Sequence, residues 1–163
     1  MKVIKPPALD EEFSPENLEV FLAGSIEMGL ASDWQNKLAE LLKFVPNLIL
    51  YNPRRDQWDS SWDQDIKHEK FHEQVSWELD HLEESNIVVF YFDPTTKSPI
   101  TLLELGLAAA QGLDCIICCP EGFWRKGNVD IICERYDLKQ VDTLEEVAEE
   151  IISAALTHEQ YVR

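Results

Sequence analysis

The sequence predicts an α/β fold in which a parallel β-sheet is covered by helices on both faces. Apolar runs of strand length recur along the chain, at residues 18–25, 48–51, 87–92 and 114–119. Segments whose apolar residues recur with helical spacing separate these runs. Strands that are apolar throughout are typical of parallel sheets buried on both faces, and a chain of 163 residues has the usual size of one compact domain.

The first predicted strand, residues 18–25, ends in a glycine and a serine and leads into a loop through Met28 and Gly29. Asp33 or Ser32 then caps a helix, because a side-chain oxygen at that position accepts from the first free backbone N–H groups. The apolar positions of this helix share one face and are Trp34, Leu38, Leu41, Leu42 and Val45.

A second short strand is predicted over residues 48–51. Residues 54–64 then form a polar and aromatic loop of a length that often carries function. A helix over residues 65–84 follows, and its apolar face consists of Phe71, Val75, Leu79 and Leu82. This helix leads to the strand at 87–92, which we expect to be central because it is apolar throughout.

The next helix begins at Ser98 and Pro99, with the serine as N-cap and the proline at the first helical position. It continues to Gln111, and Gly112 ends it because glycine readily adopts the left-handed conformation found after a helix. A strand over residues 114–119, apolar from Cys115 onward, follows.

The last part of the chain begins with a second polar and aromatic loop, over residues 121–128. We expect a final strand or two within residues 131–141, and Thr143 with Glu146 forms a capping box for a final helix. These elements predict a single domain over the whole chain, with residues 1–17 as an N-terminal extension. The sheet has about five strands in a flavodoxin-like order.

The charge of the chain excludes some classes of partner. It has 31 acidic and 14 basic side chains, and the formal net charge of −17 repels nucleic acid polymers and anionic membrane surfaces. The N-terminal residues have no apolar core of signal-peptide length, and no apolar run approaches the roughly 18 residues of a membrane span. We therefore expect a cytoplasmic protein.

Two short motifs suggest metal or redox chemistry, but neither is well supported. Cys115 and Cys118 have C-x-x-C spacing, yet residues three apart in a strand point to opposite faces. His68 and His72 match H-E-x-x-H on a predicted helix, but the surroundings are polar and no third ligand follows at a suitable spacing. We expect buried reduced thiols, solvent-facing histidines, and neither a metal ion nor another cofactor.

Glu104 is the most anomalous residue of the sequence. In open parallel sheets ligands bind beyond the carboxyl ends of the strands, and Glu104 lies in the second turn of the helix that follows the central strand. A buried charge costs several kcal/mol unless it is paired or used. Its neighbours Leu102, Leu103, Leu105 and Leu107 are apolar and read as core-facing. The alternative is that Glu104 lies at the solvent edge of this helix.

Three segments resemble one enzyme family. They are FLAGSIEMG near the start, NPRR-D-Q-W after the second strand, and SPITLLELGLAAAQG, which contains Glu104. Together they are similar to the nucleoside 2-deoxyribosyltransferases and to their relatives, the deoxynucleotide N-glycosidases. The likeness extends from about Phe21 to Asn128, and the helix segment from Glu104 to Gly112 is its most specific part.

The resemblance implies roles for several residues. The nucleophilic glutamate of the family falls on Glu104, and the acid that exchanges a proton with the nucleobase falls on Glu78 or Asp80, where the usual pattern is not kept. A glutamine that holds the nucleobase matches Gln57, and an asparagine supplied by a neighbouring subunit matches Asn128. The other candidate substrate-binding residues, in the loops after the first two strands and at the start of the Glu104 helix, are Gly24, Ser25, Arg54, Trp58 and Ser98.

Some features of the substrate stay open. Members of the better-known branch carry an aspartate where this chain has Ser98, which leaves the choice between deoxyribose and ribose undecided. Arg54 and Arg55 are adjacent arginines that suit a 5′-phosphate, or they pair with carboxylates such as Asp56. The aromatic residues of the two long loops either stack on a nucleobase or pack within the protein or between subunits. They are Trp58, Trp62, Phe123 and Trp124.

Three functions follow from these expectations. The first is a transferase that exchanges nucleobases through a covalent glycosyl-enzyme intermediate with net retention, acting on nucleosides and free nucleobases as a homo-oligomer. The second is a hydrolase that releases the base from a nucleoside or its monophosphate. The third is a nucleotide-sensing domain that binds without turnover.

Overall fold

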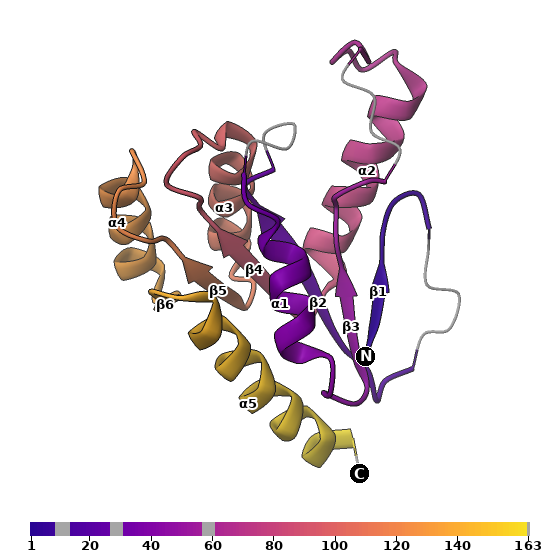
Figure 1. Ribbon diagram of the computed structural model, residues 1–163, viewed down its shortest axis with the longest axis vertical. Helices are drawn as coiled ribbons and strands as arrows, with labels where there is room; N and C mark the ends of the chain where they lie inside the picture. Colours follow the sequence, from indigo (N-terminus) through magenta and orange to yellow (C-terminus); the bar gives the residue numbers. More distant parts are fainter. Residues whose placement is uncertain (9–13, 27–30, 57–60, 163) are drawn as a thin grey trace.

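The computed structural model describes residues 1–8, 14–26, 31–56 and 61–162, and contains a parallel sheet flanked by helices (Figure 1). The strands are β1 (Lys2–Ile4), β2 (Leu18–Gly24), β3 (Leu48–Tyr51), β4 (Ile87–Tyr91), β5 (Cys115–Cys118) and β6 (Lys139–Val141). The helices are α1 (Trp34–Leu42), α2 (Glu69–Glu84), α3 (Pro99–Gln111), α4 (Lys126–Tyr136) and α5 (Leu144–Val162).

The six strands lie in the order β1-β3-β2-β4-β5-β6, and every pairing is parallel. The five strands from β2 onward have the predicted flavodoxin-like order. The sixth strand is β1, which lies within residues 1–17 and pairs along the outer side of β3. Three residues of β1 make this edge, so the sheet has one strand more than the sequence predicted.

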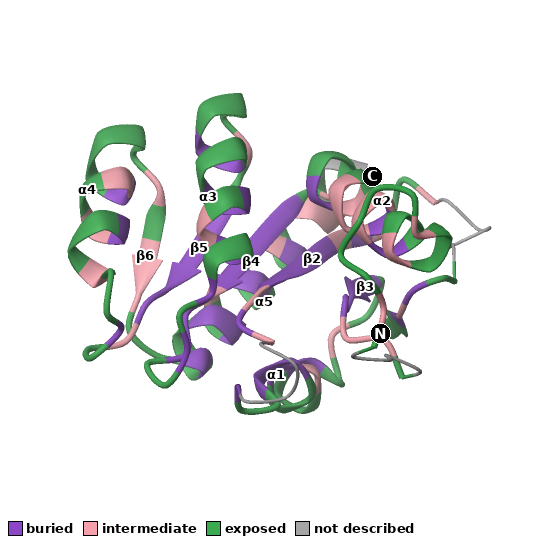
Figure 2. Ribbon diagram, turned by 90° about the horizontal axis from the view of Figure 1, so that it is seen from above, coloured by how far each residue is buried: buried purple, intermediate pink, exposed green. Residues whose placement is uncertain are grey.

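Two hydrophobic clusters cover the two faces of the sheet. One joins the sheet to α2, α3 and α4, and the other joins it to α1 and α5. Cys115 and Cys118 belong to opposite clusters, as their spacing along a strand predicts. Viewed from above, the interior strands are buried along most of their length, whereas the outer sides of the helices are exposed (Figure 2).

The boundaries of most elements agree with the sequence predictions. Asp33 caps α1, and Gly112 ends α3 in the left-handed conformation at φ 71°. The predicted capping box is present at the start of α5, where the N–H of Glu146 donates to Thr143 Oγ1 at 3.2 Å and Glu146 Oε2 accepts from the N–H of Thr143 at 3.2 Å. These local signals depend only on neighbouring residues, which is why they can be identified without tertiary information.

Three expectations about the helices are wrong. A last strand or two was expected within residues 131–141, but residues 131–136 belong to α4, so only Lys139–Val141 remains as a strand. The helix expected from residue 65 begins at Glu69, and its buried positions are Gln74, Trp77 and Leu82. Leu41, expected on the apolar face of α1, is instead exposed.

None of the described helices is both long and apolar enough to cross a membrane.

Candidate active site

The carboxyl ends of β2 and β4 lie side by side at the centre of the sheet. The strand order reverses here, since β3 lies beyond β2 on one side and β5 lies beyond β4 on the other. A crevice for ligands forms at such a point because the two flanking connections leave in opposite directions. Ser25 directly follows β2, and Asp93 follows β4 by two residues.

Ser25 is buried in a cluster of hydroxyl groups. Its Oγ lies 2.5 Å from Ser98 Oγ, and it accepts from Thr96 Oγ1 at 3.0 Å and from the N–H of Asp93 at 2.9 Å. Thr96 Oγ1 also lies 2.8 Å from Ser98 Oγ. The hydroxyls of both predicted substrate-binding serines therefore bind within the protein and join the loop after β2 to the loop after β4.

Ser98 is the N-cap residue of α3, as predicted, but its side chain makes no capping hydrogen bond. Its backbone has a positive φ of 45°, which is uncommon for a residue other than glycine. The hydroxyl of Ser98 points instead to Ser25 and Thr96. The start of α3, and with it the helix that carries Glu104, is thus held by this hydroxyl cluster.

Gly24 is required by close packing at the end of β2. A Cβ at this position would lie 2.6 Å from the Trp34 ring and 2.7 Å from the backbone oxygen of Tyr91. Contacts this short cannot be relieved without moving the backbone of β4. Gly24, predicted as a substrate-binding residue, therefore has a structural role in joining β2 to β4 and α1.

We expect Gly24→Ala to lower the free energy of unfolding by about 2 to 4 kcal/mol, because the added methyl overpacks a buried contact. Gly127→Ala is a suitable control, since a Cβ there meets nothing within 4 Å. Urea denaturation of both variants measures the difference. Equal stability of the two variants would contradict the assigned packing.

Asp93 is a site residue that the sequence analysis missed. Its Oδ2 accepts from the N–H and the hydroxyl of Ser32, at 3.0 and 2.9 Å, and its Oδ1 accepts from the hydroxyl of Thr95 at 2.6 Å. Burial opposes ionisation, but these hydrogen bonds outweigh it and lower the pKa of Asp93. Its position directly after the strand predicted over residues 87–92 was the one available signal.

Arg54 and Arg55 both lie beside carboxylates. Arg54 Nε is 3.8 Å from Asp33 Oδ1, and Arg54 Nη2 donates to the backbone oxygen of Ser32 at 3.3 Å. Arg55 Nη1 is 2.9 Å from Glu73 Oε2. Asp56, the partner suggested from the sequence, instead pairs with Lys5 at 2.5 Å.

Glu104 lies on the buried face of α3 and is only 8% exposed. Two of the leucines beside it, Leu103 and Leu107, are instead exposed, at 61% and 38%. The expectation that these leucines face the core is therefore wrong, because the inward positions belong to Thr101, Glu104, Leu105, Ala108 and Ala109. An ionisable side chain thus occupies a core position of α3 while leucines face outward.

Glu78 on α2 is the electrostatic neighbour of Glu104. Burial raises the pKa of Glu104 to about 8, and the negative charge of Glu78 contributes to that rise. Burial also raises the pKa of Glu78 to about 7, although a hydrogen bond from Gln74 favours its ionised form. Asp80, the other candidate acid, is exposed. Glu78 and Glu104 together therefore hold a proton at neutral pH. A site that uses one carboxyl group as an acid and another as a base requires such a proton.

Gln74 positions Glu78 and was not predicted. Its Nε2 donates to Glu78 Oε1 at 2.8 Å and to the backbone oxygen of Pro53 at 2.9 Å. It therefore ties the carboxyl group of α2 to the loop that follows β3. The sequence suggested Phe71, Val75 and Leu79 for the inner face, but these residues are half-buried.

The remaining predicted residues lie in α4 or outside the described part of the chain. Gln57 and Trp58 fall outside the described residues, as do Met28 and Gly29. Asn128 is exposed in the first turn of α4, and its contribution to a neighbouring subunit stays a prediction.

The aromatic residues of the two loops differ in their surroundings. Phe123 is buried and packs against Phe92, with ring centroids 4.9 Å apart. Trp124 is exposed, and its Nε1 donates to the backbone oxygen of Lys97 at 3.0 Å. Trp62 is half-buried, and the guanidinium of Arg55 lies 5.3 Å from its ring. Phe123 therefore belongs to the core, whereas Trp62 and Trp124 remain accessible.

Only one of the two histidines of the H-E-x-x-H motif lies within the helix. His68 is the N-cap of α2, and its Nδ1 accepts from the N–H of Phe71 at 3.2 Å. His72 lies within the helix, with Nδ1 at 3.3 Å from Ser76 Oγ. Across the described residues, no three His, Cys, Asp or Glu side chains group in a way that would hold a metal ion.

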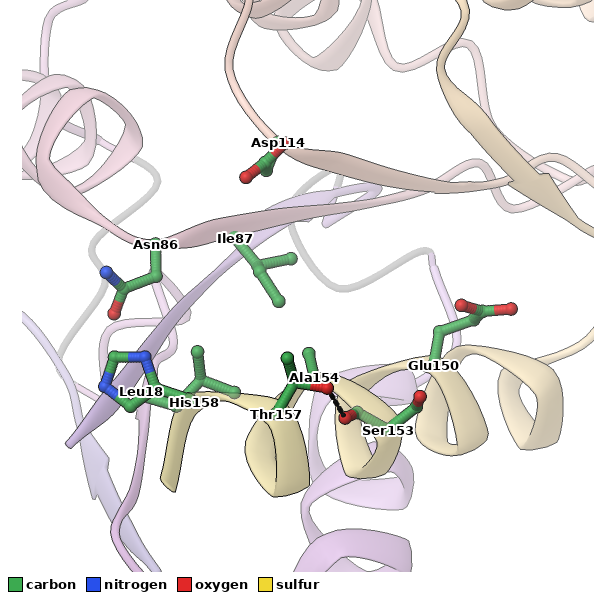
Figure 3. Close-up of a pocket in the computed structure, with 9 residues that line it drawn as sticks. All are labelled: Leu18, Asn86, Ile87, Asp114, Glu150, Ser153, Ala154, Thr157 and His158. Carbon is green, nitrogen blue, oxygen red and sulfur yellow. Dashed lines mark hydrogen bonds between the residues drawn. The ribbon is translucent and has the colours of Figure 1, made fainter. Parts of the chain in front are cut away.

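Two open hollows on the described surface lie away from Glu104. One is at the opposite, amino-terminal edge of the sheet, between the start of β4 at Ile87 and the last turns of α5 at Thr157 (Figure 3). The other is formed by residues 63–68 near the start of α2. Neither Glu78 nor Glu104 lines either hollow.

Comparisons with known proteins identify a family and a shared fold. The family described as "Nucleoside 2-deoxyribosyltransferase like" matches residues 17–123, a segment that includes Glu78 and Glu104 but ends before Asn128. No curated protein matches the chain. A solved structure, described as a conserved protein from Enterococcus faecalis V583, is similar with a TM-score of 0.56 and 17% identity. The match covers 85% of this chain and 99% of that one, and at this identity it shows a shared fold.

Proposed function

Because the chain belongs to the nucleoside 2-deoxyribosyltransferase-like family, we propose that it cleaves the N-glycosidic bond of a nucleoside and transfers the sugar to a second nucleobase. The observation that carries this proposal is the pair of neighbouring carboxyl groups on α2 and α3, of which Glu104 is buried and Glu78 is half-buried, each with a raised pKa. A pair that holds a proton at neutral pH supplies both a nucleophile and an acid.

In the first step Glu104 attacks the anomeric carbon. A bond forms between a carboxylate oxygen and this carbon while the bond to the nucleobase breaks, and the departing nitrogen takes the bonding electrons and a proton from Glu78. Positive charge develops on the sugar during this step. That charge stabilises the ionised form of Glu104, so the shared proton resides on Glu78 when the bond breaks.

In the second step the nitrogen of an incoming nucleobase attacks the same carbon. It loses its proton to Glu78, and the bond between the sugar and Glu104 breaks. Two inversions at one carbon give net retention. If water attacks instead, the product is the free sugar and the protein acts as a hydrolase, so the access of water to the intermediate decides between the two reactions.

Incubation with deoxyinosine, with and without added adenine, tests this proposal when bases and nucleosides are followed by chromatography. We expect deoxyadenosine to form only when adenine is present. Free hypoxanthine without adenine identifies a hydrolase of nucleosides, and release of base only from the 5′-monophosphate identifies a nucleotide hydrolase. No turnover of either substrate contradicts an enzymatic function and favours a nucleotide-sensing domain.

Glu78→Gln and Asp80→Asn distinguish the two candidate acids. We expect Glu78→Gln to lower kcat about 10²- to 10⁴-fold, since proton transfer in this step contributes that much. Asp80→Asn on the same helix is a matched control and is expected to change kcat less than threefold, because Asp80 is exposed. Steady-state rates of deoxyinosine cleavage measure both. A larger loss in Asp80→Asn than in Glu78→Gln reverses the assignment.

A further inference from the structure

Gln74 on α2 has an amide oxygen that makes no hydrogen bond. The residue is 3% exposed, and its Nε2 donates to the backbone oxygen of Pro53 and to Glu78 Oε1. Its Oε1 is buried and has no hydrogen-bond partner within the described part of the chain. Buried polar atoms in proteins are nearly always paired, because an unpaired one is costly. The oxygen of Gln74 is therefore available to accept from a ligand.

The surroundings of this amide determine which of its two atoms is left free. A backbone carbonyl can only accept, so the nitrogen of Gln74 faces Pro53 and the oxygen faces away from it. If the amide were turned over, its oxygen would lie against the oxygen of Pro53, and its N–H groups would lose both acceptors. The chemistry of the neighbours thus identifies Oε1 as the free atom.

The free oxygen of Gln74 lies beside the carboxyl group of Glu78. The two residues are four positions apart, so their side chains lie on the same side of α2, and a hydrogen bond of 2.8 Å joins them directly. This bond occupies Glu78 Oε1, which leaves Oε2 to carry the proton when the group is an acid. The joined side chains therefore contain one free acceptor, Gln74 Oε1, and one donor, Glu78 Oε2.

Nucleobases differ in whether they match a neighbouring donor and acceptor. Adenine has an acceptor at N7 and an amino group beside it, whereas guanine has two acceptors, N7 and O6. Hypoxanthine has the same N7 and O6 edge. An acid that donates to N7 and an oxygen that accepts from the amino group thus fit adenine, whereas O6 of hypoxanthine would face the amide oxygen. N7 belongs to the same five-membered ring as the nitrogen that carries the sugar, so this edge lies close to the bond that breaks.

We propose that Gln74 Oε1 accepts from the amino group of the nucleobase and makes the protein selective for adenine nucleosides over those of hypoxanthine and guanine, an inference that rests on the proposed function. Cytosine belongs to the same class of base, since its amino group lies beside an unprotonated ring nitrogen. The nitrogen of Gln74 thus positions the acid, and its oxygen selects the base. The same selectivity makes adenine a better acceptor than hypoxanthine in the second step.

The ratio of kcat/KM for deoxyadenosine to kcat/KM for deoxyinosine tests this proposal. We expect Gln74→Met to lower the ratio about 10- to 100-fold, since methionine has a similar length but no amide oxygen. The intrinsic difference between the two leaving bases is the same in both proteins and cancels in the comparison. Poorer positioning of Glu78 lowers both rates and leaves the ratio unchanged. A ratio within twofold of the wild type in Gln74→Met overturns the proposal.

Two further variants separate base selection from structural effects. Gln35 is also a buried glutamine whose amide has no hydrogen-bond partner among the described residues, but it lies on α1, which covers the other face of the sheet. We expect Gln35→Met to keep the wild-type ratio. Gln74→Glu retains an acceptor and should keep the preference for deoxyadenosine even if both rates fall. Equal ratios in Gln74→Glu and Gln74→Met, or the same loss in Gln35→Met, overturn the proposal.

Calorimetric titration with free adenine and free hypoxanthine separates this inference from the reaction. We expect the wild type to bind adenine at least about tenfold more tightly than hypoxanthine, and we expect Gln74→Met to bind the two bases alike. That result without turnover of any nucleoside supports the base selectivity and contradicts the proposed reaction. Equal affinity of the wild type for the two bases, or no binding of either, overturns the selectivity even if nucleosides are cleaved.

Discussion

Glu104→Gln is expected to lower kcat for deoxyinosine cleavage at least about 10⁴-fold while leaving the protein folded. Glutamine has nearly the same shape but no negative charge, so it neither bonds to the anomeric carbon nor stabilises the charge that develops there. Glu104 is buried on the inward face of α3. Its replacement therefore changes the chemistry of the site more than its packing.

Single-turnover and steady-state rates measure this loss, and circular dichroism verifies the fold. Glu134→Gln is the matched control, since Glu134 is exposed on α4, and its rate should equal that of the wild type. Mass spectrometry of wild-type protein quenched in acid during turnover should reveal a glycosyl adduct on the peptide that contains Glu104. Turnover of Glu104→Gln within tenfold of wild type would exclude Glu104 as the nucleophile.

The anomaly of Glu104 was visible in the sequence because it depends on one helix. A carboxylate among leucines in the helix after the central strand indicates either a functional acid or a solvent edge. The structure places Glu104 inside and Leu103 outside. Successive helical residues differ by about 100° in direction, so a helix packed on one side buries only part of each turn. Whether Glu104 shares the inward side with Leu103 or with Leu105 depends on the packing of α3 against the sheet.

Contacts between distant residues were not predictable from the sequence. The hydroxyls of Ser25 and Ser98 meet across 73 residues, and Gln74 reaches the backbone of Pro53 across 21. No local pattern encodes such pairs, because they arise only when the strands assemble in their order. Asp93 could be located at a strand end, but its partner Ser32 lies 61 residues away.

The error at residues 131–136 has a different physical cause. The segment begins with Ile131 and Ile132, whose branched side chains favour strands when considered alone. In the structure Val129 and Cys133 are both buried, and they lie four residues apart on one face of α4. Packing of this face onto the sheet outweighs the weak local preference.

The wild-type protein is expected to become less stable as pH rises from about 4.5 to about 8, with a loss on the order of 5 kcal/mol. Glu78 and Glu104 have raised pKa values of about 7 and about 8 in the folded state, against 4.5 for an ordinary glutamate. The folded state therefore binds more protons than the unfolded state in this range. Stability is fully present below about 4.5 and is lost progressively until both groups are ionised.

The magnitude follows from the size of the pKa changes. One pKa unit corresponds to about 1.4 kcal/mol, so ionisation of Glu104 alone opposes folding by several kcal/mol. Asp93 acts in the opposite direction, since its pKa is lowered, but its contribution is lost only at acidic pH, below the range considered. The decline between pH 5 and 8.5 therefore reports mainly on Glu78 and Glu104.

The variant Glu78→Gln/Glu104→Gln isolates this effect, because glutamine keeps the shape of the side chain but has no charge to bury. Urea denaturation at pH 5.5, 7 and 8.5 should show a nearly constant free energy of unfolding for the double variant and a falling one for the wild type. The inactive protein should thus be the more stable one at pH 8.5. Parallel pH dependence of the two proteins would mean that these carboxyl groups are solvated, and the acid and base of the proposed reaction would have to be sought elsewhere.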